Sequence, residues 1–162
     1  MDLFTSDPYL HMMQRPLLLL HGALGASSQL RDLADSLASS YPVHLFDFPG
    51  HGGTNMPAAP FSIPSFAASL LDFIKERGWD EVDIFGYSMG GYVAMYLAKY
   101  HPGLVHRIIT LATKFHWDEA TAAKEVQMLD PETIQVKIPA YAAMLEQRHH
   151  PNDWKGVLQR TA

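Results

Sequence analysis

One serine in this sequence has the neighbours that prepare a hydroxyl group for nucleophilic attack. Ser88 is the centre of Gly86-Tyr87-Ser88-Met89-Gly90, directly after the apolar run 82–85 and directly before an apolar helical pattern. A Gly-x-Ser-x-Gly segment in this position forms a strand-to-helix turn so sharp that only small residues fit two places before and after the serine. The turn raises the hydroxyl above the sheet, where it can attack a carbonyl carbon. The alternative interpretation is a glycine-rich turn that only packs a helix against a sheet.

A second segment, His21-Gly22-Ala23, follows the first apolar run of the chain. Attack on a carbonyl group places negative charge on its oxygen, and backbone N–H groups fixed in a turn can stabilise that charge. We expect the N–H groups of Ala23 and Met89 to form this oxyanion hole, and we expect His21, Gly22 and Tyr87 to border the substrate pocket. The His21 ring itself is better interpreted as a hydrogen-bonded turn residue than as a catalytic group.

An acidic residue and a histidine occur together in the segment Asp47-Phe48-Pro49-Gly50-His51. They could imitate a catalytic dyad, but both precede Ser88 in the chain. We interpret Asp47 and His51 as residues whose hydrogen bonds hold a loop in place.

Two hydrophobic periodicities alternate over the first 113 residues and predict the elements that position these groups. Short apolar runs bounded by turn residues indicate buried parallel strands at 17–20, 43–48, 82–85 and 107–111. Apolar residues at i, i+3, i+4 and i+7 indicate helices at 30–37, 63–77 and 90–98 between them. This alternation predicts an α/β fold with a mostly parallel sheet flanked by helices. The carboxyl ends of strands 16–21 and 82–87 then flank the crevice where open α/β sheets bind ligands.

The strand pattern ends at Thr113, and four helices are expected after it. Asp118 can N-cap a helix that extends to residue 129, and Asp130 with a following proline opens a second helix. Residues 141–149 form a third helix, and Asn152 or Asp153 starts a fourth. We therefore expect a core at 1–113 and a helical cap or lid region at 114–162.

The composition excludes several classes of partner. The 162 residues include 12 Lys+Arg, 17 Asp+Glu and no cysteine, which gives a formal net charge of −5. Because no basic cluster is present, we expect no nucleic acid and no polybasic membrane anchor. The longest apolar run is too short to span a bilayer, and residues 1–10 lack a basic targeting region, so we expect a cytoplasmic protein without a membrane partner. We also expect neither a metal nor a cofactor.

Together, the segments 21–23, 47–52 and 86–90 resemble those of the α/β-hydrolase superfamily, in the branch of compact esterases, carbon-carbon bond hydrolases and menaquinone-pathway synthase-like lyases. The resemblance covers residues 16–113. It implies strand order 4-3-5-6 in the family's strand numbering, an oxyanion hole at 21–23, and a C-terminal helical cap that roofs the substrate pocket. Apolar side chains of that cap would suit an apolar or aromatic acyl group, although such residues at helical spacing more often belong to a core: Trp117, Met128, Tyr141, Met144, Leu145 and Trp154.

The resemblance also implies an acid and then a histidine after the serine, following late strands of the sheet. No such strands are predicted here, so we expect this catalytic segment to be absent from the chain. Asp118 with His116, His149 or His150 could replace it, although we interpret these four as solvated cap residues.

The predicted function is that of a serine hydrolase acting on a small acyl or ester substrate, or a related carbonyl compound, through Ser88. Two alternatives remain open: a non-catalytic ligand-binding relative of the fold, and a lyase that uses Ser88 as a base. The uncovered edge of the last predicted strand also predicts self-association of the chain.

Overall fold

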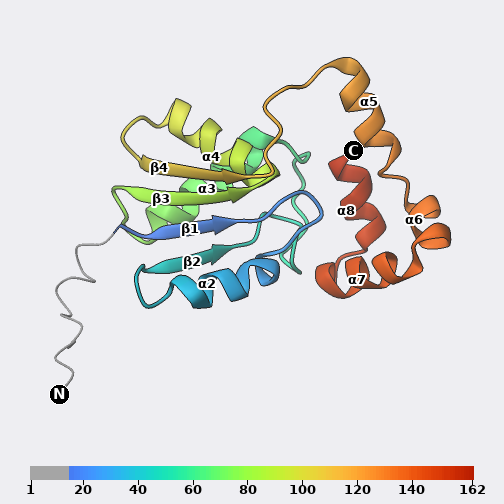
Figure 1. Cartoon of the computed structure of the whole chain (residues 1–162), viewed down its shortest axis with the longest axis horizontal. Helices are drawn as coiled ribbons and strands as arrows, with labels where there is room; N and C mark the ends of the chain where they lie inside the picture. The colour runs from blue at the N-terminus through green and yellow to red at the C-terminus, as the bar shows by residue number, and fades with distance from the viewer. Residues whose placement is uncertain (1–14) are drawn as a thin grey trace.

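The computed structural model describes residues 15–162, which form a parallel four-stranded sheet with helices on both faces and further helices at one end (Figure 1). The strands are β1 (Leu17–Leu20), β2 (Val43–Phe46), β3 (Val82–Tyr87) and β4 (Val105–Leu111). Their order is β2-β1-β3-β4, so the predicted α/β class and strand order are confirmed. The expectation about residues 1–10 lies outside the described residues.

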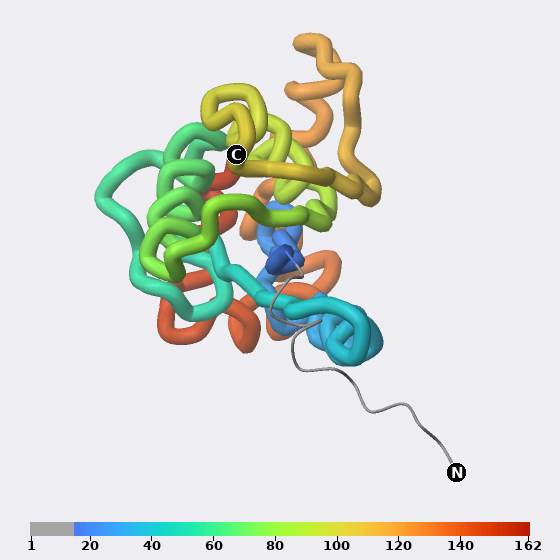
Figure 2. The backbone as a smooth tube through the Cα atoms, turned by 90° about the vertical axis from the view of Figure 1, so that its left-hand side faces the viewer, coloured from blue at the N-terminus to red at the C-terminus, as the bar shows by residue number. Residues whose placement is uncertain are grey.

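The helices that connect consecutive strands cover both faces of the sheet. A short 3-10 helix, η1 (Ser27–Leu30), leads into α2 (Arg31–Leu37), and the later crossovers are α3 (Ile63–Glu76) and α4 (Met89–Tyr100). α2 and α3 lie on opposite faces of the sheet (Figure 2). The main core lies under α3 and α4, where fully buried side chains from β1 and α3, such as Leu18, Leu20 and Leu70, pack together. Burial of such side chains is the main force that holds these layers together.

Four helices follow β4: α5 (Glu119–Gln127), α6 (Pro131–Lys137), α7 (Pro139–His149) and α8 (Trp154–Thr161). They stand at the carboxyl ends of the strands (Figure 1), and we call them the C-terminal helices. Asp118, Asp130 and Asp153 accept hydrogen bonds from the first turns of α5, α6 and α8, as the sequence predicts. No helix within residues 15–162 is both long and apolar enough to cross a membrane.

A second, smaller core joins the C-terminal helices to each other and to the sheet. Leu145, Trp154, Val157 and Leu158 are buried in it. One residue of the loop after β1, Leu24, is buried in the same cluster. The C-terminal helices therefore pack against the turn that follows β1.

His149 on α7 is fully buried, which corrects the expectation that it is solvated. The amide of Gly52 donates to its Nδ1 at 3.4 Å, and its Nε2 lies 3.2 Å from the carbonyl oxygen of Leu24. Because Nδ1 accepts a hydrogen bond, the proton is on Nε2 and the ring is neutral. The sequence pattern of α7 could not indicate this burial, because the residues that cover His149 lie about a hundred positions earlier in the chain.

Three imidazole rings form a buried row, with ring centroids 5.3 Å apart for His21 and His51 and 5.6 Å apart for His51 and His149. Burial lowers the pKa of His21 to about 4 and that of His51 to about 3. Burial is also the main cause of the lowered pKa of His149, to which the positive charge of Arg148 adds, while Asp47 acts in the opposite direction. All three rings are therefore neutral at neutral pH.

β4 is the outer strand on one side of the sheet, and no other strand of the described residues pairs with its outer edge. Its side chains Ile109 and Leu111 are 63% and 56% exposed. Helix α2 leaves these side chains uncovered, because it lies over β2, at the opposite edge of the sheet (Figure 2). An open apolar strand of this kind is a template for pairing with another chain.

We predict that the chain self-associates through β4, and that Ile109→Lys weakens this association because a charged edge strand opposes pairing. Light scattering over a range of protein concentrations measures the effect. Val136→Lys is the matched control, because Val136 is 78% exposed on α6, away from the sheet edge. A wild-type chain that stays monomeric at all concentrations would contradict the prediction.

We also predict that the free energy of unfolding falls as the pH decreases from about 6.5 towards 4. An unfolded histidine binds its proton near pH 6.5, whereas the folded His21 and His51 bind theirs only near pH 4 and 3. Within this window the unfolded state holds more protons, so each ring lowers stability by up to about 1.4 kcal/mol per pH unit. Denaturant unfolding at pH 7.5, 6.0 and 5.0 measures the slope.

His51→Phe should reduce this slope, since the ring already packs against Phe61 and Phe66 and its Nε2 has no hydrogen-bond partner among the described residues. His116→Gln, at an exposed position outside the row, serves as the control and should keep the slope. Equal stability at pH 7.5 and 5.0 in the wild type would refute the buried neutral row.

Candidate active site

The turn at Ser88 is shaped by close backbone packing. Ser88 lies between the last residue of β3 and the first residue of α4, and its φ is 50°. A Cβ atom on Gly86 would stand 2.5 Å from the amide nitrogen of Gly91. A Cβ atom on Gly90 would stand 2.6 Å from the carbonyl oxygen of Leu20. Both distances are too short for a side chain, which explains why the two flanking positions are glycine. The sequence pattern predicts small residues there for the same steric reason.

Hydrogen bonds hold Ser88 in this left-handed conformation, which costs a non-glycine residue roughly 1–3 kcal/mol. Its N–H donates to the carbonyl oxygen of Leu111 at 2.8 Å. Its own carbonyl oxygen accepts from the amide of Gly91 and from the hydroxyl of Thr113. The backbone of Ser88 is therefore fixed from both sides, by α4 and by the end of β4.

Ser88 opens into a cleft of about 600 Å³ between the sheet and the C-terminal helices. Ala23 and Met89 line the same cleft. Neither of their amide groups donates a hydrogen bond to another described residue. The cleft thus brings together Ser88 on its strained turn and two backbone N–H groups without a partner among the described residues. One is that of Ala23, in the loop after β1, and the other is that of Met89, at the start of α4.

Most of the other cleft residues are apolar. Phe61, Phe66, Trp117, Val126, Met128 and Leu129 contribute to its walls. The charged residues that line it, Lys114 and Glu125, form an ion pair with 2.6 Å between Nζ and Oε1. Such a cleft suits an apolar ligand more than a charged one.

The lining of the cleft does not include three residues that the sequence predicts at the border of the pocket: His21, Gly22 and Tyr87. His21 is buried and accepts from the amide of Phe48 at its Nε2, 3.2 Å away, while its Nδ1 lies 2.8 Å from the carbonyl oxygen of Gly22. A Cβ on Gly22 would stand 3.0 Å from the Tyr87 ring and 3.1 Å from Ser88 Cβ. These residues support the turn that carries Ala23.

Asp47 and His51 hold the loop after β2. Both carboxylate oxygens of Asp47 accept from Ser27, one from its N–H and one from its hydroxyl, each at 2.6 Å. The carbonyl oxygen of His51 accepts from the hydroxyl of Thr54 at 2.7 Å. The interactions of Asp47 and of the His51 backbone are those of loop residues, as expected from their position before the serine.

Within residues 15–162, none of the candidate replacements for the acid and the histidine lines the cleft or is hydrogen-bonded to Ser88. Asp118 caps α5, His149 is buried against Leu24 and Gly52, and His116 and His150 are exposed. No side chain of the described residues is hydrogen-bonded to the Ser88 hydroxyl. The cleft therefore brings together a candidate nucleophile and candidate oxyanion donors without a neighbouring base.

Sequence reasoning did not single out the link between α4 and the segment after β4. Trp117 Nε1 donates to the Tyr92 hydroxyl at 2.6 Å, and that hydroxyl donates to the carbonyl oxygen of Lys114. Tyr92 lies four residues after Ser88, one turn further along α4, so it follows Ser88 on one helix face. Its position on the cleft wall could have been inferred from this spacing.

No group of histidine or acidic side chains within the described residues is arranged to hold a metal ion. The cleft offers the hydroxyl group of Ser88 and the backbone donors of Ala23 and Met89. In principle, this arrangement can form a covalent bond to a carbonyl carbon and stabilise the resulting oxyanion.

Comparisons with known proteins agree with the geometry. A pimeloyl-[acyl-carrier protein] methyl ester esterase of Neisseria meningitidis is 37% identical over 95 residues, which cover 59% of this chain and 35% of that protein. A probable alcohol acetyltransferase of Cyberlindnera fabianii is 32% identical over 103 residues, 62% of this chain and 28% of that protein. The chain spans about a third of the length of these curated relatives.

Among solved structures, NosK from Streptomyces actuosus matches 91% of this chain with a TM-score of 0.79 and 23% identity, over 63% of its own length. MenH from S. aureus matches 91% of this chain with a TM-score of 0.71 and 18% identity, over 65% of its own length. At these identities the likeness concerns the fold. The family profile described as alpha/beta hydrolase fold matches residues 15–135, well over half of the sequence and including the whole sheet and the Ser88 turn. The chain therefore belongs to the alpha/beta hydrolase fold family.

Proposed function

We propose that this chain carries the nucleophile and the oxyanion hole of a serine hydrolase that cleaves an ester or a related carbonyl compound. The observation that carries the proposal is the shared cleft: Ser88 stands on a strained turn, and the amides of Ala23 and Met89 line the same cavity without hydrogen-bond partners among the described residues. In this scheme the Ser88 hydroxyl gives its proton to a base and attacks the carbonyl carbon, while the two amides hold the oxyanion. The ester C–O bond then breaks, the alkoxy group takes up a proton and leaves as the alcohol, and the acyl group stays on Ser88. Water finally cleaves this acyl-serine ester, which releases the acid and restores the hydroxyl.

The substrate class follows from the cleft walls. Aromatic and aliphatic side chains from α3 and the C-terminal helices surround the space next to Ser88, and Lys114 and Glu125 neutralise each other. We infer an apolar acyl group of the ester, with the C-terminal helices acting as its cap. The relative from Neisseria meningitidis is named for the methyl ester of an acyl chain, which fits such a pocket.

A serine hydroxyl is a weak nucleophile at neutral pH unless a base removes its proton. Because no described side chain is hydrogen-bonded to Ser88, these 162 residues should react slowly by themselves. Added imidazole can act as an external base in the open cleft, as the histidine of such enzymes does. This provides an experiment that separates the site from its activation.

We predict that a fluorophosphonate probe labels Ser88 slowly, and that the labelling rate rises in proportion to the concentration of neutral imidazole. Peptide mass mapping after timed incubation identifies the labelled residue. Ser88→Ala should lose the labelled peptide completely, and Ser36→Ala, at an exposed position on α2, should keep it. Labelling spread evenly over several serines, or no labelling of Ser88 at any imidazole concentration, would support a ligand-binding relative of the fold instead.

For turnover without added imidazole, we predict that the chain hydrolyses short activated esters little faster than Ser88→Ala does. A p-nitrophenyl acetate assay with both proteins at equal concentration measures the difference. Rapid turnover that depends on Ser88 would show that a base reaches the serine, and His116, His149 and His150 would then be substituted in turn.

A further inference from the structure

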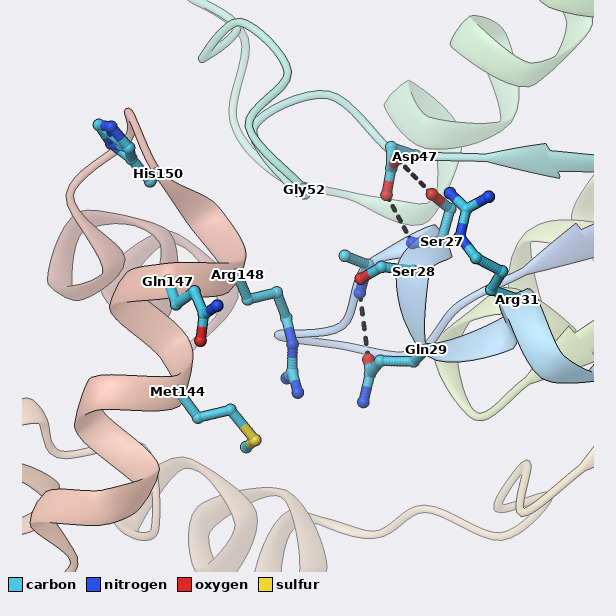
Figure 3. A pocket seen from close by; sticks show the side chains of 11 residues that line it. Ser27, Ser28, Gln29, Arg31, Asp47, Gly52, Met144, Gln147, Arg148 and His150 are labelled. Atoms are coloured by element: carbon cyan, nitrogen blue, oxygen red, sulfur yellow. Dashed lines mark hydrogen bonds between the residues drawn. The ribbon is translucent and has the colours of Figure 1, made fainter.

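A second cavity, of about 550 Å³, lies between η1, the loop after β2 and helix α7 (Figure 3). It shares no lining residue with the cleft at Ser88. Polar side chains make up most of its wall, among them Ser27, Ser28 and Gln29 from one side and Gln147 and Arg148 from the other. A polar cavity of this size can hold a small molecule that makes several hydrogen bonds.

Two arginines line this cavity on a chain whose formal net charge is −5. Arg148 extends from α7 towards the segment that carries Ser28 and Gln29, and Arg31 comes from the opposite wall, at the start of α2 (Figure 3). The ion-paired arginines within residues 15–162 are Arg15 and Arg107, so neither cavity arginine has a carboxylate partner there. A concentration of unpaired guanidinium groups attracts anions.

Arg148 is the more informative of the two because it is partly buried. Its Nη1 donates to the carbonyl oxygen of Leu24 at 2.8 Å, which uses one of its five N–H donors. Burial lowers its pKa, which means that the charged form loses solvation in the folded chain. A positive charge that is partly removed from water and lacks an anionic partner is unfavourable, and a bound anion would compensate for that cost.

One acidic residue, Asp47, also lines the cavity, but its interactions leave the arginines free. Both of its oxygens accept hydrogen bonds from Ser27. Gly52, at a φ of 56°, packs so closely against the carboxylate that a side chain at this position would collide with it. Asp47 is therefore held by Ser27 of η1 and is not ion-paired with Arg31 or Arg148. The cavity keeps two positive charges against one negative charge.

We propose that this second cavity is a binding site for a small organic anion, whose phosphate or carboxylate group is held by Arg148 and Arg31. The hydroxyl of Ser28 and the amide groups of Gln29 and Gln147 provide further hydrogen bonds to the rest of such a ligand. The guanidinium group suits both oxyanions because its N–H groups match two oxygens at once. The site does not depend on Ser88 or on the proposed hydrolase reaction.

Isothermal titration of the 162-residue chain tests the proposal, with inorganic phosphate and succinate as separate probes at constant ionic strength. We expect saturable binding of at least one probe, and the stronger probe identifies the oxyanion. Arg31→Gln, at an exposed side chain, should weaken the binding about tenfold, which corresponds to about 1.4 kcal/mol. Arg148→Gln should abolish it, and Arg148→Lys should retain a part of it.

Arg77→Gln is the matched control, because Arg77 lies at the end of α3 and stacks on the Phe73 ring, on the other face of the sheet. It and Ser88→Ala should bind the probe as the wild type does. Circular dichroism of Arg148→Gln checks the fold, and Arg31→Gln decides the question if that variant unfolds. No saturable binding of either probe, or equal binding by the wild type and Arg31→Gln, would overturn the proposal.

Discussion

The start of α4 passes the end of β1 with almost no space between the two backbones. Gly90 comes so near to the carbonyl oxygens of Leu20 and His21 that a Cβ there would stand within 2.6 and 2.9 Å of them. Because α4 can lie this close to β1, the amide at the start of α4 and the loop after β1 reach the same cleft. The position of Ser88 beside the loop after β1 depends on this approach.

The sequence predicts most of the core because its patterns are local. β1 matches the expected residues, and the aspartates that cap α5, α6 and α8 occur where capping chemistry indicates. The expected strand 107–111 begins two residues earlier, at Val105. The polar residue His106 interrupts the apolar pattern at this start. Its ring contacts Asp83 of the neighbouring strand β3, an interaction that the pattern of one strand does not reveal.

The sequence predicts less where distant segments meet. His149 has the neighbours of a surface residue in the chain, yet Leu24 and Gly52 cover it in the fold. The cavity at Arg148 could not be predicted for the same reason, because helix α7 and η1, which form two of its walls, are more than a hundred positions apart in the sequence. Leu145, Trp154 and Tyr141 pack in the small core of the C-terminal helices, which is the alternative that their helical spacing left open. Periodicity indicates that such residues are buried but not against which partner.

Leu24 connects the two layers of the molecule through very few bonds. Its φ is 55°, its side chain belongs to the small core, and its carbonyl oxygen interacts with both Arg148 and His149 of α7. The peptide unit of Ala23 is directly next to it in the chain. The contacts of α7 with Leu24 therefore help to fix the turn that brings Ala23 to the cleft wall. A backbone donor that precedes Ser88 by 65 positions is thus held in place by a helix that follows Ser88 in the chain.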